Sequence, residues 1–239
     1  MKRWQLAILL CVLALSALVG CGTDIGASSV PQDVSQKSSH PENQPQEEPE
    51  VEYAPGTWVT DSRFESEFWN IAFTLPQNWL AATAEELGVV TEKGGALLNE
   101  ELRAQAEKAF ETGASFTEMG ATNLGEGTNL IMMVDNFSGI TGGSTITEET
   151  YANIVAQQLK NLTEMAYTME QDLVTLTIAD KEFTVMKALV EEYGIAQWYA
   201  LYKKGSYMCT LVCTFPAQSK EEDILTVFSN VTVLSKNHK

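Results

Sequence analysis

The stretch that decides the fold is Ile195-Ala-Gln-Trp-Tyr-Ala-Leu-Tyr202, in which apolar and aromatic residues occupy both alternating sets of positions. Neighbouring side chains on a β-strand point to opposite faces of the sheet. Tyr199 and Leu201 would therefore share one face, and Trp198 would lie on the other face with two alanines. A sheet that is half open to water alternates more cleanly between apolar and polar residues. This stretch therefore predicts a strand that is covered on both faces.

The segments on either side extend this strand into an antiparallel meander. Asp180-Lys181, Gly194 and Gly205 interrupt the apolar runs, and each break is short enough for a hairpin. We expect helices to cover both sides of the resulting sheet. The four predicted strands are residues 173–178, 183–191, 195–202 and 207–215.

The earlier part of the domain predicts further strands. Aromatic residues alternate with polar ones from Trp58 to Leu75, which predicts a hairpin whose second strand stops at Pro76. Residues 115–122 and 128–137 predict two more strands, joined by a turn that contains glycines.

Helices are predicted from capping and periodicity. Thr83-Ala-Glu-Glu86 has the spacing of a capping box and predicts a short helix that reaches Val90. Apolar residues recur at helical spacing from Glu148 to Met169, which predicts the longest helix. Ser219-Lys-Glu-Glu222 has the same capping-box spacing and predicts a final helix. A further helical segment is predicted over residues 97–110.

The arrangement resembles a known family. An aromatic hairpin is followed by Phe73-Thr-Leu-Pro76 and Trp79, and a late meander is closed by a helix. This order resembles the Mog1/PsbP-like fold, in particular the small lipoproteins of clostridial-type bacteria with that domain. The resemblance covers residues 58–234 and implies an α+β fold, a three-layer α/β/α sandwich around a mainly antiparallel sheet. Family members are mostly binding or assembly accessories, so the resemblance implies no catalytic residue.

The N-terminus has the order of an export signal. Two basic residues precede an apolar run over 6–19, and the small residue Gly20 precedes Cys21. Leu18-Val-Gly-Cys21 resembles the lipobox of bacterial lipoproteins. The resemblance implies lipidation of Cys21, cleavage before it, and attachment to the extracytoplasmic face of the cell membrane. The alternatives are ordinary secretory cleavage and an uncleaved anchor, for which the run is several residues short of the about 20 that a bilayer requires.

Composition divides the rest of the chain into a tether and one domain. Residues 1–20 form the signal, and residues 21–54, rich in Ser, Gln, Pro and Glu, form the lipidated N-terminus and a flexible acidic tether. The remaining residues, 55–239, are numerous enough to bury a core without disulfides or metals. We therefore expect a single globular domain.

The chain is strongly acidic. Its formal charge is −17, and removal of Lys2 and Arg3 with the signal lowers it to −19 (−17 − 2). Such a surface repels the phosphates of nucleic acids, so nucleic acid is excluded as a partner. Solubility of an exported protein and affinity for cationic ligands both explain this charge.

Cys209 and Cys213 are the cysteines of the predicted domain. Four residues along a strand place them on one face about 13 Å apart, at about 3.3 Å per residue. A disulfide requires Cα atoms within about 7 Å, so the two cannot bridge each other and should remain thiols. We interpret them as small hydrophobic residues of a core strand; a metal or redox pair is the alternative.

Few residues in the domain offer catalytic chemistry. His40 lies in the tether and His238 beside the C-terminus, which removes histidine-based triads and metal sites from the domain. The glycine-rich segment 136–144 has two interpretations, a backbone contact for a ligand or a plain connection. We therefore predict a non-enzymatic module, without cofactor or metal, that binds a ligand or an envelope protein or assists assembly. The alternative is a carboxylate-dependent envelope glycan hydrolase, which would need two acids across a cleft.

Overall fold

The computed structural model describes residues 52–83, 85–88, 100–162 and 165–235. The signal segment, Cys21, His40 and His238 lie outside the described residues. In the described part, no helix is both long enough and apolar enough to cross a membrane.

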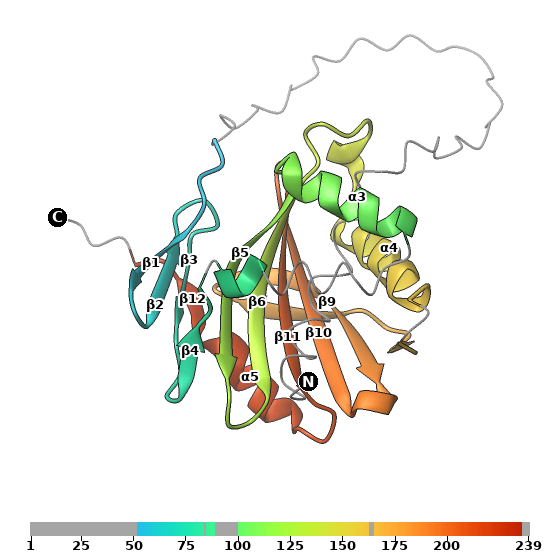
Figure 1. The fold of residues 1–239 in the computed structure, drawn as a ribbon. Helices are drawn as coiled ribbons and strands as arrows, with labels where there is room; N and C mark the ends of the chain where they lie inside the picture. Colours follow the sequence, from blue (N-terminus) through green and yellow to red (C-terminus); the bar gives the residue numbers. More distant parts are fainter. Residues whose placement is uncertain (1–51, 84, 89–99, 163–164, 236–239) are drawn as a thin grey trace, which may run out of the picture.

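A large antiparallel sheet runs through the middle of the domain (Figure 1). Its strands are β4 (Trp79–Ala81), β5 (Ser115–Asn123), β6 (Thr128–Asn136), β7 (Thr168–Met169), β8 (Val174–Ile178), β9 (Lys181–Val190), β10 (Ile195–Lys204) and β11 (Tyr207–Pro216). The strand order is β4-β5-β6-β11-β10-β9-β7, and β8 also pairs with β9. The predicted meander from β8 to β11 is confirmed, and β6 pairs with β11 on its other side.

A second, smaller antiparallel sheet joins the two ends of the described chain. Its strands are β1 (Thr57–Thr60), β2 (Arg63–Ser66), β3 (Ile71–Thr74) and β12 (Val231–Val233), in this order. Val231 pairs with Phe73 and Val233 with Ile71. The predicted stop before Pro76 is confirmed, since β3 ends at Thr74.

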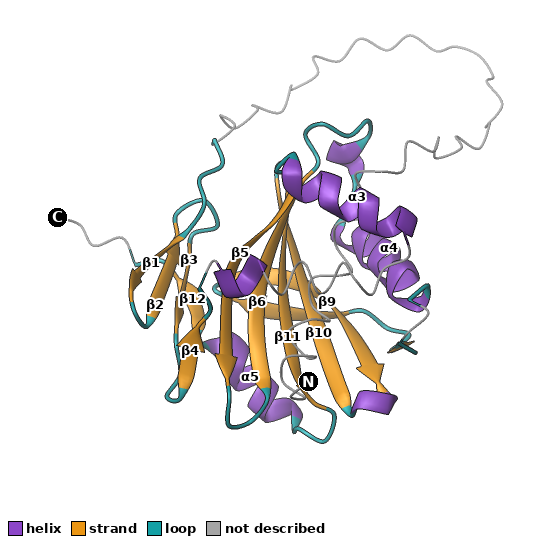
Figure 2. Ribbon diagram, in the orientation of Figure 1, coloured by secondary structure: helices purple, strands orange, loops and turns teal. Residues whose placement is uncertain are grey.

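The helices lie on opposite faces of the large sheet (Figure 2). The longer helices are α3 (Glu100–Glu111), α4 (Glu148–Lys160) and α5 (Glu221–Ser229), with short 3-10 turns at Gly143–Thr145 and Glu191–Tyr193. Residues 85–88 are helical as predicted, and the expected end of that helix at Val90 lies outside the described residues. Helices α3 and α4 pack on one face. The smaller sheet and α5 pack together on the other. The fold is therefore α+β with mostly antiparallel sheet, and on the second face a sheet joins the expected helix.

The central strand β10 is buried on both faces, as its sequence predicts. Tyr199 is 0% exposed and packs with α4, whereas Trp198 is 7% exposed and packs with α5 and the smaller sheet. Cys209 and Cys213 are buried thiols on the same face as Trp198, which confirms their core location.

The predicted helix 148–169 is too long. Helix α4 ends at Lys160, with Asn161 as its C-cap, and the chain then becomes extended in β7. Met165 and Tyr167 are both buried although neither is helical. The predicted stripe contained Met165 and Met169, and their spacing of four suits one face of a helix and one face of a strand alike, so the apolar stripe alone did not separate the two.

The two predicted capping boxes have different outcomes. The amide of Thr83 donates to Glu86 Oε2 over 2.8 Å, and the amide of Glu86 donates to Thr83 Oγ1 over 3.2 Å, which confirms the first box. The second box does not form, because the N-cap of α5 is Lys220 and makes no side-chain cap, but the final helix that it predicted is present as α5. The amide of Ser219 instead donates to the carbonyl of Pro216, so a turn delays the helix by one residue.

Candidate functional site

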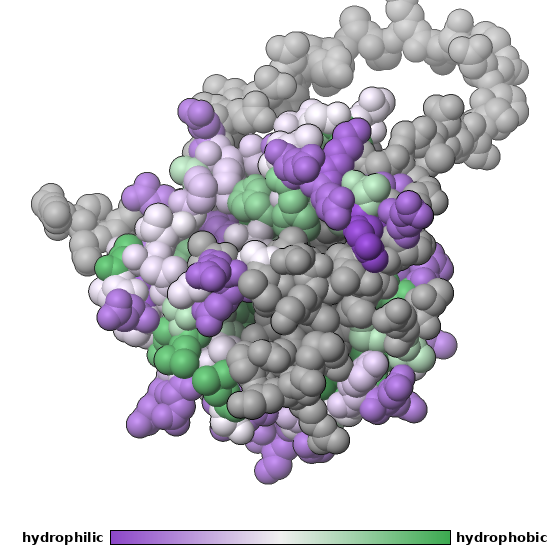
Figure 3. Space-filling model, viewed as in Figure 1, coloured by the Kyte–Doolittle hydropathy of each residue, from purple (hydrophilic) through white to green (hydrophobic). Residues whose placement is uncertain are grey.

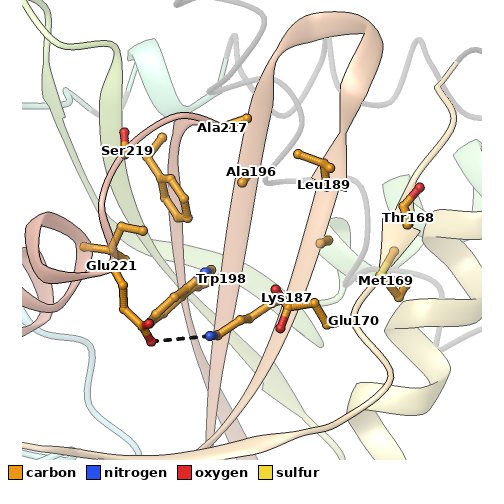
Figure 4. Close-up of a pocket in the computed structure, with 13 residues that line it drawn as sticks. Thr168, Met169, Glu170, Lys187, Leu189, Ala196, Trp198, Ala217, Ser219 and Glu221 are labelled. Atoms are coloured by element: carbon orange, nitrogen blue, oxygen red, sulfur yellow. Dashed lines mark hydrogen bonds and ion pairs between the residues drawn. The ribbon is translucent and has the colours of Figure 1, made fainter.

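A groove of about 380 Å³ opens on the second face of the large sheet, between β7 and the start of α5 (Figure 4). Its floor comes from the ends of β9, β10 and β11, where small and apolar side chains leave room. Charged residues stand at the rim. The lining residues used below are Glu170, Lys187, Leu189, Trp198, Glu221 and Ile224.

Lys187 is the basic residue that lines this groove. Its Nζ lies 4.1 Å from the centroid of the Trp198 ring, within the range of a cation–π contact. The same Nζ lies 3.5 Å from Glu221 Oε1. The Lys187 side chain is 15% exposed and that of Glu221 is 65% exposed, so the pair joins a sheltered cation to an open carboxylate. Figure 4 shows Lys187 extended from β9 toward Glu221 beneath the indole.

Trp198 is held in place by aromatic neighbours. Its ring stacks on Phe228 of α5 with centroids 6.3 Å apart and meets Phe215 edge to face at 6.1 Å. Because the side chain is only 7% exposed, the indole offers no open face for a sugar ring to stack on. The groove therefore presents charge and aliphatic surface rather than an aromatic platform.

Sequence reasoning did not find this site. It placed Glu221 at the start of a predicted helix, where acids are common because they interact favourably with the helix N-terminus, and it assigned Trp198 to the covered strand alone. Glu170 and Lys187 carry no local motif. The groove forms because the N-terminus of α5 and the segment around β7 both pack near the same ends of β9, β10 and β11. These segments are distant in sequence, so no local spacing predicts that they come together.

A second group of polar contacts surrounds Glu118. The pairing of β5 with β6 shifts register between Thr117 and Met119, so a β-bulge contains Glu118. Such an irregularity re-aims a side chain. Here the carboxylate accepts hydrogen bonds from Tyr53 Oη at 2.8 Å, the Gly56 amide at 2.5 Å and Trp69 Nε1 at 3.1 Å. Burial raises the pKa of Glu118, and the donated hydrogen bonds oppose that rise.

Tyr53 lies within the stretch expected as tether but packs on the domain. Its ring stacks on Tyr207 at 4.8 Å and meets Phe68 and Phe116 edge to face at 4.8 and 5.3 Å. Burial and the Glu118 carboxylate both raise the pKa of the Tyr53 phenol. Contacts of the folded domain therefore begin two residues before the expected boundary at 55.

Asp135 is a fully buried acid under α4. Tyr151 Oη of α4 donates to Asp135 Oδ2 over 2.6 Å. Burial raises the Asp135 pKa to about 7, and the hydrogen bond from Tyr151 acts against this rise. The group joins α4 to the sheet and does not line the groove.

Hydrogen bonds within the glycine-rich segment 136–144 and from Lys203 hold its backbone in place. The amides of Ile140 and Gly143 donate to carbonyls within the segment. Lys203 Nζ donates to the carbonyls of Ser144 and Ile146, each over 2.6 Å. These contacts favour the interpretation of a connection over that of a ligand contact.

The surface carries few large apolar side chains in the described part. Figure 3 shows hydrophilic residues spread between smaller hydrophobic patches. The large apolar residues that are exposed are Val59, Leu80, Leu124, Val174, Tyr193 and Leu225. Among the described residues, no group of three or more His, Cys, Asp or Glu side chains is placed to hold a metal ion.

No protein-family model matches the chain, and no curated protein sequence is similar to it. Among solved structures, cyanobacterial PsbP (CyanoP) from Synechocystis sp. PCC 6803 is 10% identical with a TM-score of 0.45, over 77% of this chain and 96% of that chain. A protein from Bacteroides thetaiotaomicron is 12% identical with a TM-score of 0.36, over 74% of this chain. This chain spans half, 50%, of that second protein.

Proposed function

We propose that this chain is a lipid-anchored protein of the extracytoplasmic membrane face, whose domain binds an envelope protein or ligand without catalysing a reaction. The single observation that supports binding is the groove in which Lys187 lies between Trp198 and Glu221. The order of residues 1–21, with Cys21 after the lipobox-like sequence, supports the anchor.

The finer fold assignment is part of this proposal. We assign the domain to a Mog1/PsbP-like, three-layer fold. The support is the opening hairpin before Pro76 and Trp79, the coverage of the large sheet on both faces, and the closing helix α5.

Position-specific photocrosslinking in intact cells tests the binding. A photoreactive amino acid at Leu189 or Ser219 places the probe in the groove, and the same residue at Glu107 places it on exposed α3 across the sheet. We expect a discrete adduct, identified by mass spectrometry, from the groove positions and none from Glu107. Equal labelling at all three positions, or none in the groove, contradicts a binding role for this site.

Metabolic labelling with a fatty-acid analogue tests the anchor. Wild-type protein should carry the label, and Cys21→Ala should lose it and accumulate as an unprocessed precursor. Equal labelling of the two proteins contradicts the lipoprotein assignment.

A glycan hydrolase is the second candidate, because Glu170 and Glu221 line one groove. One feature argues against it. The sheltered Trp198 leaves no stacking surface for a sugar. Release of reducing ends from cell-wall glycan that is lost in both Glu170→Gln and Glu221→Gln would replace the binding proposal.

A further inference from the structure

The groove already contains a cation that belongs to the chain itself. Lys187 Nζ lies over the Trp198 ring at 4.1 Å and beside Glu221 at 3.5 Å. A cation from a partner would need the exposed carboxylate of Glu221, and the Trp198 face would become available to it only after Lys187 has left. Lys187 therefore marks the position in which an incoming ammonium or guanidinium group is stabilised.

The hold on Lys187 is weak enough to be exchanged. An ion pair whose acid is 65% exposed contributes little to stability, because water screens it. Glu221 is open on its solvent side, and Glu170 is a second exposed acid in the groove. The groove thus offers two carboxylates for one internal lysine.

The net charge of the whole chain also favours a cationic partner. At −17 the protein repels anionic partners and attracts cationic ones, which increases the rate of encounter. An anionic ligand would have to displace Glu221 from Lys187 against this field. The long aliphatic stem of an arginine or lysine also suits the apolar floor at Leu189 and Ile224.

We infer that the groove binds a basic side chain, arginine or lysine, from an extended segment of a protein partner, and that Lys187 is its internal competitor. This inference rests on the proposed function. The partner's cation pairs with Glu170 and Glu221, and Lys187 swings toward solvent as it enters.

Peptide binding to the full-length chain, purified in detergent, tests the inference. The probes are fluorescein-labelled Gly-Ala-Arg-Ala-Arg-Gly and its Glu counterpart, measured by fluorescence anisotropy at low and physiological salt. We expect the arginine peptide to bind more tightly. Glu221→Gln should lower the affinity for the arginine peptide about fivefold, and Lys187→Met should raise this affinity by a similar factor. Glu107→Gln is the control, because it removes the same charge from α3, outside the groove. This variant should change the affinity for the arginine peptide less than twofold.

Opposite responses identify an anionic occupant and overturn the inference. In that case the Glu peptide binds better, Lys187→Met abolishes binding and Glu221→Gln strengthens it. If neither peptide binds while Leu189 and Ser219 still crosslink in cells, the inference is wrong and the proposed function stands. If the groove also fails to crosslink, both are wrong. Glu221 is exposed, so its variant remains informative even if Lys187→Met does not fold.

Discussion

The phenol of Tyr53 donates a 2.8 Å hydrogen bond to the carboxylate of Glu118, a residue in the bulge of β5. The two residues lie 65 positions apart in the sequence. Together with the Gly56 amide and the Trp69 indole, Tyr53 supplies Glu118 with three donors from two parts of the chain, the entry segment and the turn between β2 and β3. Glu118 therefore ties the entry of the domain to its large sheet.

Tyr53→Phe removes the hydroxyl donor and keeps the ring packing. Because a hydrogen bond to a partly buried carboxyl group is lost, we expect the free energy of unfolding to fall by about 1–2 kcal/mol. Urea denaturation measures the change. Tyr193→Phe, at an exposed tyrosine, is the matched control and should be neutral. Equal effects of the two changes would show that the Tyr53 hydroxyl contributes nothing.

Gly56→Ala tests how closely the entry segment approaches the domain. A Cβ at this position would lie 2.7 Å from the Glu65 carbonyl oxygen and 2.8 Å from Glu118 Oε1. Relief of this overlap requires backbone movement, so we expect a loss of about 1–3 kcal/mol in denaturation. Gly139→Ala is the control, because its Cβ would meet open space. A neutral Gly56→Ala would mean that the segment shifts freely.

Asp135→Asn should change how stability depends on pH. Below about pH 4 the carboxyl is protonated in both folded and unfolded states, so it has no effect. As pH rises toward 7, the unfolded chain ionises first and the wild type loses stability. The Asp135 pKa is about 7 in the folded protein, and its ordinary value is 3.8. This difference corresponds to a loss of about 4 kcal/mol in the free energy of unfolding of the wild type.

The asparagine variant lacks this titration. The free energy of unfolding of the variant should therefore rise relative to that of the wild type between about pH 4 and pH 7. Above about pH 7 the difference between the two proteins should stay constant. Urea denaturation across this pH range measures the gap, and Asp172→Asn at an exposed site should show none. A gap that is independent of pH would contradict the raised pKa of Asp135.

Trp198→Ala and Tyr199→Ala should both destabilise the fold. The two neighbours face opposite layers and both are buried, so each truncation leaves a large cavity. We expect each to cost about 3–5 kcal/mol by denaturation. An effect at only one of the two positions would mean that one face of β10 is poorly packed.

The regular parts of this fold could be predicted from sequence, because local rules determine them. Two-sided apolar character placed β10 in the centre of the sheet, and the Thr83 box identified a helix start. The end of α4 could not be predicted, because Met165 and Met169 lie four residues apart, and this spacing fits both a helix and a strand. Only pairing of β7 with β9 decides between them, and that pairing is a long-range contact.

The polar sites were harder to predict than the core. Glu118 is aimed by a bulge that leaves no mark in composition, and Lys187 meets Glu221 only after α5 has docked. Each site joins residues from distant segments. A sequence with no alignment shows which groups are present but not which ones converge.

The closing strand β12 has a consequence for how the protein is made. The sheet begun by β1, β2 and β3 gains its last strand only at Val231–Val233, almost the final residues of the described chain. Contacts between such distant segments slow folding, because the intervening chain must first be ordered. During synthesis, β3 therefore waits with an unpaired edge until the whole domain has emerged. A nascent chain that stalls before Val231 would present that edge to proteases and to other chains.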